Sequence, residues 1–111
     1  MVDEIAVRRG DVFLVELIPT RGSEIRKTRP CVIVSPDELN THLRTFIVAP
    51  LTSGQQAYPF RVSCRFQNRR GHVVLDQIRS VDRERLVRRL GRLSAPAIER
   101  SLSILQEMFA R

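Results

Sequence analysis

The sequence predicts a mainly β domain with helices (α+β): a small, strongly bent antiparallel sheet or open barrel that carries an amphipathic C-terminal helix. Short apolar runs recur along the chain with turn residues between them, as in proteins built from closely spaced strands. The last stretch instead repeats its apolar residues at helical spacing. With 111 residues, 42% of them apolar, the chain 1–111 is expected to form a single domain.

Three apolar runs in the first half are expected to be strands: residues 11–17 (DVFLVEL), 31–35 (CVIVS) and 45–51 (TFIVAPL). A charged loop, 18–28, should join the first two. A short helical turn at 36–43 should join the second and third. Pro50 is expected to mark an edge or the end of its strand, because proline has no N–H to donate to a ladder.

The second half begins with the clearest two-residue alternation in the chain, at 60–66, where apolar residues and arginines alternate and predict one buried and one basic face. A turn is expected at 68–71. Residues 72–81 should form a further strand, interrupted at Asp76 and Gln77. After a turn at 81–84, residues 86–93 should form the last strand.

The C-terminal helix is expected to start after Ser94. A serine at the N-cap and a proline, Pro96, in the first turn are both typical of helix starts. One face is expected to carry the apolar residues and to pack on the sheet: Ile98, Leu102, Leu105 and Met108 or Phe109.

The net charge of +7 is placed unevenly. Residues 1–55 carry 7 Lys+Arg and 7 Asp+Glu, whereas residues 56–111 carry 12 Arg and 5 acids, and therefore the whole excess. Such asymmetry favours a polyanionic partner, either a nucleic acid or an acidic protein. Codon usage is an alternative origin, since Lys27 is the only lysine beside 18 arginines.

Cofactor and metal motifs are missing from the sequence. Cys31 and Cys64 have no metal-ligand spacing and are expected to be buried free thiols, and His42 and His72 are expected to be ordinary surface residues. No apolar run reaches the roughly 18 residues that a membrane span requires. The N-terminus has no signal-peptide pattern, so the expected compartment is the cytoplasm.

The candidate chemistry lies at strand ends. Arg29 precedes a rigid proline and a buried strand, Thr52 and Ser53 follow another, and Glu24 and Asp76 supply carboxylates. An arginine, hydroxyls and a carboxylate suffice for metal-free cleavage of RNA, in which the ribose 2′-OH attacks the phosphate. DNA lacks that hydroxyl, so the chemistry would select RNA.

Several sequence blocks occur in one order from about residue 9 to the C-terminal helix: "RGDVFLVEL", "PTRGSEIRKTRPCVIVSPDELN", "IVAPLTS", "YPFRV", "VVLDQIRSVD" and "LGRLS". Together they resemble the MazF/PemK family of toxins of toxin–antitoxin pairs. The resemblance implies an SH3-like barrel and a homodimer. It also implies a metal-independent, sequence-selective endoribonuclease that cleaves single-stranded RNA and is inhibited by the acidic, disordered tail of a cognate antitoxin.

The resemblance also implies roles for single residues. It assigns catalysis to Arg29, Thr52 and Glu24, and a catalytic or RNA-binding role to Asp76, Gln77 and Ser53. Phosphate binding is expected of four residues in the charged loop: Arg21, Arg26, Lys27 and Thr28. Some relatives have an arginine two residues before the aspartate, but this chain has Val74 there. The catalytic arginine is therefore expected to be Arg29.

Each of these residues also has an ordinary structural interpretation. Arg29 and Glu24 could pair with each other, Thr52 and Ser53 could form a turn, and Asp76 could pair with Arg79. Two other function classes also remain. One is a non-catalytic RNA-binding barrel; the other is a toxin of the same fold that acts on a protein such as a topoisomerase.

Overall fold

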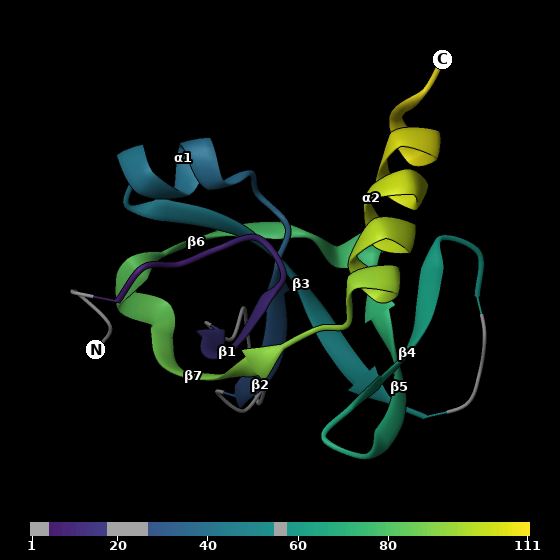
Figure 1. The fold of residues 1–111 in the computed structure, drawn as a ribbon, viewed down its shortest axis with the longest axis horizontal. Coiled ribbons are helices and arrows are strands. Elements are labelled where there is room, and N and C mark those ends of the chain that lie inside the picture. The colour runs from purple at the N-terminus through teal and green to yellow at the C-terminus, as the bar shows by residue number, and fades with distance from the viewer. Residues whose placement is uncertain (1–4, 18–26, 55–57) are drawn as a thin grey trace, which may run out of the picture.

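The computed structural model describes residues 5–17, 27–54 and 58–111. Its elements are seven strands, two α-helices and two short 3₁₀ segments (Figure 1). Their bounds are β1 Asp11–Leu17, β2 Lys27–Ile33, α1 Asp37–His42, β3 Thr45–Ser53, β4 Arg61–Phe66, β5 Arg69–Val74, η1 Leu75–Gln77, β6 Arg79–Asp82, η2 Arg83–Arg85, β7 Leu86–Arg92 and α2 Ala95–Phe109.

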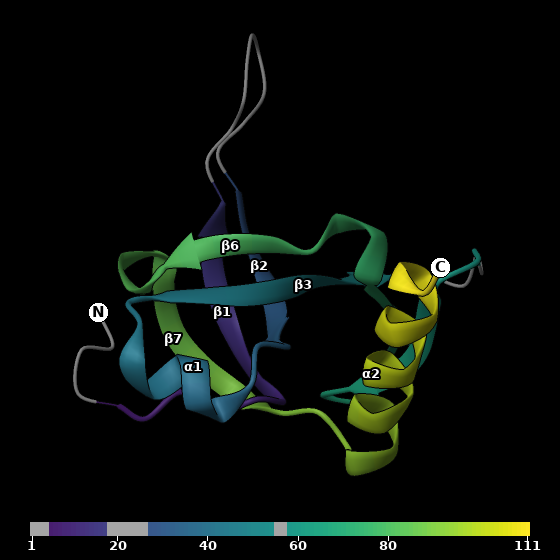
Figure 2. The ribbon, with the colours of Figure 1, turned by 90° about the horizontal axis from the view of Figure 1, so that it is seen from above.

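The strands form one antiparallel sheet in the order β4-β5-β3-β2-β1-β7. The long strand β3 organises it, because its first half pairs with β6 and its last three residues pair with β5 along the same edge. Figure 2 shows β6 and β3 running side by side, with α1 and α2 at opposite ends. The expected bent sheet with a C-terminal helix is confirmed, but the sheet does not close, since its end strands β4 and β7 do not pair in the described part.

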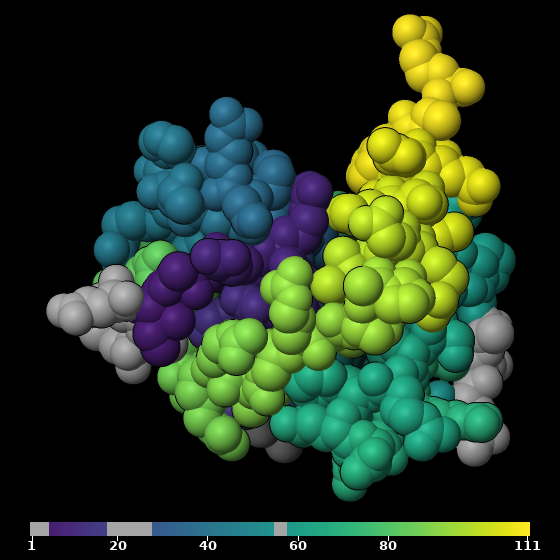
Figure 3. All heavy atoms as spheres, in the orientation of Figure 1, coloured from purple at the N-terminus to yellow at the C-terminus, as the bar shows by residue number. Residues whose placement is uncertain are grey.

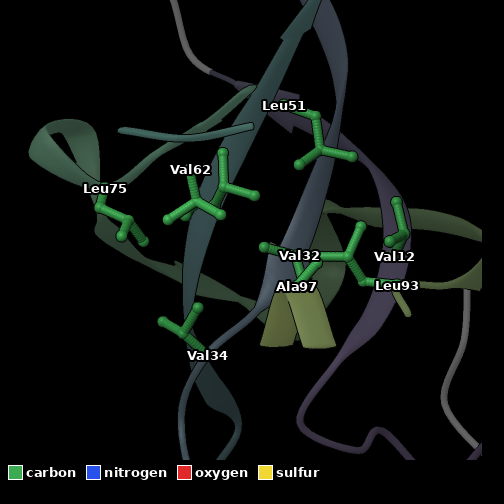
Figure 4. Close-up of a cluster of buried hydrophobic side chains, with 10 residues drawn as sticks. Val12, Val32, Val34, Leu51, Val62, Leu75, Leu93 and Ala97 are labelled. Carbon is green, nitrogen blue, oxygen red and sulfur yellow. The ribbon is translucent and has the colours of Figure 1, made fainter. Parts of the chain in front are cut away.

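The core lies on both faces of the sheet, because strand side chains alternate. Phe13 and Val15 of β1 point into one fully buried cluster with Ile33, Phe46 and Leu86. Val12 points to the other face, into a second cluster built around β2, β3, β4 and α2 (Figure 4). The two-residue periodicity of the sequence therefore corresponds to two cores.

Helix α2 covers the second cluster. The Ser94 hydroxyl accepts a hydrogen bond from the Ala97 N–H at 3.3 Å, so the predicted N-cap is confirmed. Ile98, Leu105 and Met108 pack against the core as expected, whereas Leu102 is half-buried and is not part of this cluster. Phe109, the last residue of the helix, is 69% exposed.

Strands β2 and β3 extend beyond their expected bounds. Strand β2 starts at Lys27 rather than at residue 31, and β3 continues through Pro50 to Ser53. Pro50 lies between Val48, where pairing with β6 ends, and Leu51, where pairing with β5 begins. A residue without an N–H is thus placed where the ladder on this side is interrupted, which explains why the proline does not end the strand.

The expected strand 72–81 is two strands, β5 and β6, separated by η1 at Asp76 and Gln77. The preceding turn is also shorter than expected. It consists of Gln67 and Asn68, both with positive φ, so β5 begins at Arg69. The earlier start carries His72 into the sheet, where it is 8% exposed; its expected surface position is wrong, whereas His42 is exposed.

Neither helix in the described ranges is long and apolar enough to cross a membrane.

Candidate active site

A hollow of about 300 Å³ opens where β2 begins, β3 ends and the β4–β5 hairpin turns. Figure 1 shows the end of β3 beside β4 and β5. The three strand segments contribute differently: β2 supplies Arg29 and Pro30, and β3 supplies Leu51, Thr52 and Ser53. The hairpin supplies the remaining wall.

The hollow is lined by three of the site candidates predicted from the sequence: Arg29, Thr52 and Ser53. The β2–β3 pairing ends at Cys31 opposite Pro50, and Arg29 and Thr52, each two residues further along its strand, both line the hollow. Arg29 is exposed, and no described residue pairs with its guanidinium. Thr52 donates a hydrogen bond from its hydroxyl to the carbonyl oxygen of Ser53 at 2.9 Å. Their proximity follows from strand pairing, and not from closeness in the sequence.

Other candidates fall outside this hollow or outside the described residues. Glu24, Arg21 and Arg26 lie outside the described residues, so a pairing of Glu24 with Arg29 is not tested. Lys27 begins β2, and Thr28 is exposed on it, opposite Glu16 of β1.

Asp76 and Gln77 form part of η1 and do not line the hollow. The Asp76 carboxylate accepts two hydrogen bonds from Arg61 of β4, from Nε at 2.9 Å and from Nη2 at 3.1 Å. This hydrogen-bonded guanidinium lowers the pKa of Asp76 below its usual value. The arginine partner is thus Arg61, and not Arg79 as considered from the sequence. Val74, where some relatives have an arginine, is 2% exposed in the core.

The sequence interpretation missed the contribution of the hairpin. Five of its residues line the hollow together with Gly71: Cys64, Phe66, Gln67, Arg69 and Arg70. The signal that could have found them is the pair Arg69-Arg70 directly after the Gln67-Asn68 turn. No carboxylate of the described residues lines this hollow, so its three arginines make it strongly electropositive.

The cysteines are free thiols, as expected. Cys31 of β2 is fully buried in the cluster that contains Phe13 and Ile33, and burial raises the pKa of its thiol to about 12. Cys64 is only half-buried in the wall of the hollow, and burial again raises its pKa. Neither thiol therefore supplies a thiolate nucleophile near neutral pH. In the described part, no three His, Cys, Asp or Glu side chains gather as metal ligands would.

The chain and its fold are similar to known proteins. The chain is 39% identical over 106 residues to the endoribonuclease MazF9 of Mycobacterium tuberculosis, covering 80% of this chain and 84% of that protein. It is 35% identical over 81 residues to the endoribonuclease toxin MazF of Escherichia coli K12, covering 73% of each. The crystal structure of MazE–MazF (Form-II) from Deinococcus radiodurans matches with a TM-score of 0.81 and 25% identity, covering 95% of this chain and 96% of that one.

The family described as "PemK-like, MazF-like toxin of type II toxin-antitoxin system" matches residues 8–109, which include every described residue of the hollow. The match spans the two cores and α2, and so nearly the whole fold. The chain therefore belongs to the PemK/MazF family of toxins.

Proposed function

We propose that this protein is the toxin of a type II toxin–antitoxin pair and an endoribonuclease that cleaves single-stranded RNA at selected sequences without a metal ion. The observation that carries the proposal is the convergence of Arg29 and Thr52 in a hollow that contains three arginines and no described carboxylate. Such a site attracts a phosphodiester and offers a hydroxyl beside it. The endoribonuclease relatives support the reaction type.

The reaction needs only groups that the chain and RNA supply. The ribose 2′-oxygen attacks phosphorus while its proton passes to a base, and the bond from phosphorus to the 5′-oxygen breaks as that oxygen takes up a proton. Arg29 stabilises the negative charge that builds on the phosphoryl oxygens, since its guanidinium keeps its charge throughout. Thr52 offers a hydroxyl to hold the phosphate. The products of this step are a 2′,3′-cyclic phosphate and a 5′-hydroxyl, and a water molecule can then open the cyclic phosphate to a 3′-phosphate.

Glu24 remains our proposed base, and the pairing of Asp76 with Arg61 supports this choice over Asp76. A carboxylate held by two hydrogen bonds to arginine, with a lowered pKa, is a weaker proton acceptor than a free one. Asp76 also lies in η1, away from the hollow. We assign phosphate attraction to Arg21, Arg26, Lys27 and Thr28, as the family resemblance implies.

The expected partner is a cognate antitoxin with an acidic tail. The excess of arginine in residues 56–111 suits such a tail, and a ribonuclease must be restrained in the cell that makes it. The Deinococcus radiodurans relative was crystallised as MazE–MazF, which supports a toxin–antitoxin complex here. We further propose a homodimer that acts in the cytoplasm, where its free thiols would stay reduced.

The direct test is incubation of the purified protein with a long RNA in excess chelator, followed by mapping of the new ends. We expect cleavage at a short recurring sequence and 5′-hydroxyl ends. Replacing the 2′-OH of the target nucleotide by hydrogen should stop the reaction. Cleavage of that substituted RNA at the same bond would exclude the 2′-OH route.

Arg29→Ala should lower cleavage by roughly 10²-fold or more, the scale of losing one group that stabilises transition-state charge. The exposed Arg29 belongs to no buried cluster, so the variant should stay folded. Arg44→Ala is the control, because the exposed Arg44 precedes β3 at its far end, about 30 Å along the strand from Ser53. RNA binding without cleavage by the wild type would instead favour a non-catalytic RNA-binding barrel, and inhibition of a topoisomerase without either would favour a protein target.

A further inference from the structure

The β4–β5 hairpin carries a second group of arginines beyond Arg29. The register of the hairpin pairs Phe66 with Arg69 and sets Arg65 directly opposite Arg70. All three arginines are exposed, and Arg69 and Arg70 also line the hollow. Figure 3 shows the segment that contains the hairpin, drawn in teal, at the lower right margin of the molecule. The exposed arginines are therefore open to a long ligand.

These arginines are not neutralised by the protein. Like charges directly opposite each other on two strands destabilise a hairpin. Among the described residues, none forms an ion pair or a side-chain hydrogen bond with Arg65, Arg69 or Arg70. The contrast with other arginines is clear: Arg61 at the base of the same hairpin binds Asp76, and Arg89 binds Asp11. The hairpin tip thus concentrates positive charge at a cost in stability, as functional surfaces do.

The tip is also held in a defined position. The side-chain amide of Gln67 donates to the carbonyl oxygen of Leu90 in β7 at 3.4 Å. The Phe66 ring packs over Gly91, where a Cβ would approach the ring to 3.3 Å and where φ is +154°. The absence of a side chain at Gly91 therefore makes room for Phe66. Figure 1 shows the hairpin turning toward β7. The three arginines therefore extend from a hairpin whose tip contacts β7.

We propose that the tip of the β4–β5 hairpin is a second phosphate-binding subsite, in which Arg65, Arg69 and Arg70 bind backbone phosphates of the RNA strand that flanks the cleaved bond. This subsite rests on the proposed function, since it extends the same hollow. Arginine forks bind phosphate bidentately, and a group of arginines without acidic partners suits a polyanion. RNA is favoured over an acidic peptide because Arg69 and Arg70 line the same hollow as Arg29 and Thr52, so one strand can reach both.

Binding is measured with an RNA that contains the cleavage sequence and carries a 2′-deoxynucleotide at the cleaved position. Fluorescence anisotropy over a range of salt concentrations gives the affinity and its salt dependence. Arg65→Gln, Arg69→Gln and Arg70→Gln should each weaken binding by roughly tenfold, the scale of a charged hydrogen bond. Each should also reduce the slope of log K against log salt by about 0.7. Arg44→Gln should change neither quantity.

A substrate shortened on its flank separates this role from a general effect on the site. On a long RNA, Arg65→Gln should raise KM and leave kcat nearly unchanged, because Arg65 belongs to the proposed subsite but does not line the hollow that holds Arg29 and Thr52. On an RNA trimmed to the cleavage sequence, wild type and Arg65→Gln should converge, because the flanking phosphate that Arg65 binds is gone. Arg70→Gln should also raise Tm, since it removes the repulsion with Arg65; a merely structural arginine would lower it.

Three outcomes would overturn the subsite. Unchanged affinity and salt slope in the arginine variants, with normal RNA binding by the wild type, would reject it and leave the proposed function standing. If the arginine variants bound an acidic peptide more weakly but bound RNA as the wild type does, the tip would be assigned to a protein partner. Absence of RNA binding and cleavage by the wild type would reject both proposals together.

Discussion

Gly71 of β5 packs directly against the backbone of Thr52 in β3, and a Cβ at residue 71 would overlap the Thr52 carbonyl oxygen. The two strands pair here, with Ser53 opposite Gly71 and Thr52 opposite His72. Both Thr52 and Gly71 line the hollow. Glycine at this position thus lets the end of β3, with its catalytic candidate, approach the hairpin that forms the opposite wall.

Gly71→Ala should therefore impair cleavage by displacing Thr52. A shift of about 1 Å at a positioned group costs on the order of 10²-fold in rate, so we expect a loss of that scale in kcat. Single-turnover cleavage by protein that keeps its circular dichroism spectrum measures it. The control is Ser63→Ala, an exposed change on the neighbouring strand. A Gly71→Ala protein that is folded and fully active would show that the close contact does not position Thr52.

Asp76 and Arg61 are expected to form a structural ion pair. Asp76 is not expected to act as the catalytic base, and Arg61 is not expected to bind the substrate. Asp76→Asn and Arg61→Gln should each retain most of the cleavage activity, because neither residue lines the hollow. Their effects on stability should be similar and small, and the double variant should lose no more than either single one. Loss of activity by 10²-fold or more in Asp76→Asn alone, with Arg61→Gln active, would return Asp76 to the catalytic group.

The same pair predicts a dependence of stability on pH. Because Arg61 lowers the pKa of Asp76 in the folded state, the pair stabilises the protein above the unfolded-state value near 3.8. That stabilisation is lost as the pH falls through the lower, folded-state pKa. Urea unfolding at pH 6 and then at steps below pH 4 should show the wild type losing its advantage over Asp76→Asn. A constant difference across that range would contradict the assignment. The effect should be modest, since both side chains contact solvent.

The thiols should react slowly in the native protein. Burial raises the pKa of Cys31 to about 12, so at pH 8 almost none of it is thiolate. A disulfide reagent such as DTNB should modify Cys31 only at the rate of unfolding, and Cys64 faster, because Cys64 is half-buried in the hollow. Cys64→Ala should remove the faster phase. Rapid native modification of Cys31 in that variant would mean that β2 opens far more readily than its packing implies.

Asp11 should be the most costly charged residue to replace. Its buried carboxylate accepts hydrogen bonds from the Arg8 N–H at 3.0 Å, from Arg89 at 3.2 Å and from Arg92 at 3.1 Å. It thereby ties the start of β1 to β7. Asp11→Ala should lower the free energy of unfolding by about 1–3 kcal/mol, because three donors lose their acceptor. Denaturant unfolding of both variants provides the check. The control is Glu84→Ala at an exposed position, whose free energy of unfolding should lie within about 0.5 kcal/mol of wild type.

Local sequence patterns determined the elements whose signals are short-range. The apolar runs of β1 and β3, the helical turn α1 and the Ser94 cap of α2 are all visible in the chain, because periodicity, β-branching and capping act over a few residues. The resemblance to toxins also pointed to Arg29 and Thr52 as a pair. These two residues are 23 positions apart, and no local rule brings them together.

Tertiary structure decided what depends on register and on turns. The positive φ of Gln67 and Asn68 starts β5 earlier than expected, which buries His72 and carries Arg69 and Arg70 to the hollow. The break in pairing along β3 accommodates Pro50 within the strand. Asp76 pairs with Arg61 because η1 lies beside β4. The spacing of the two residues in the sequence does not reveal this contact. Each outcome depends on which strand lies next to which. The order of the strands is the one that buries both apolar clusters, and it therefore depends on residues from the whole chain and not on any single segment.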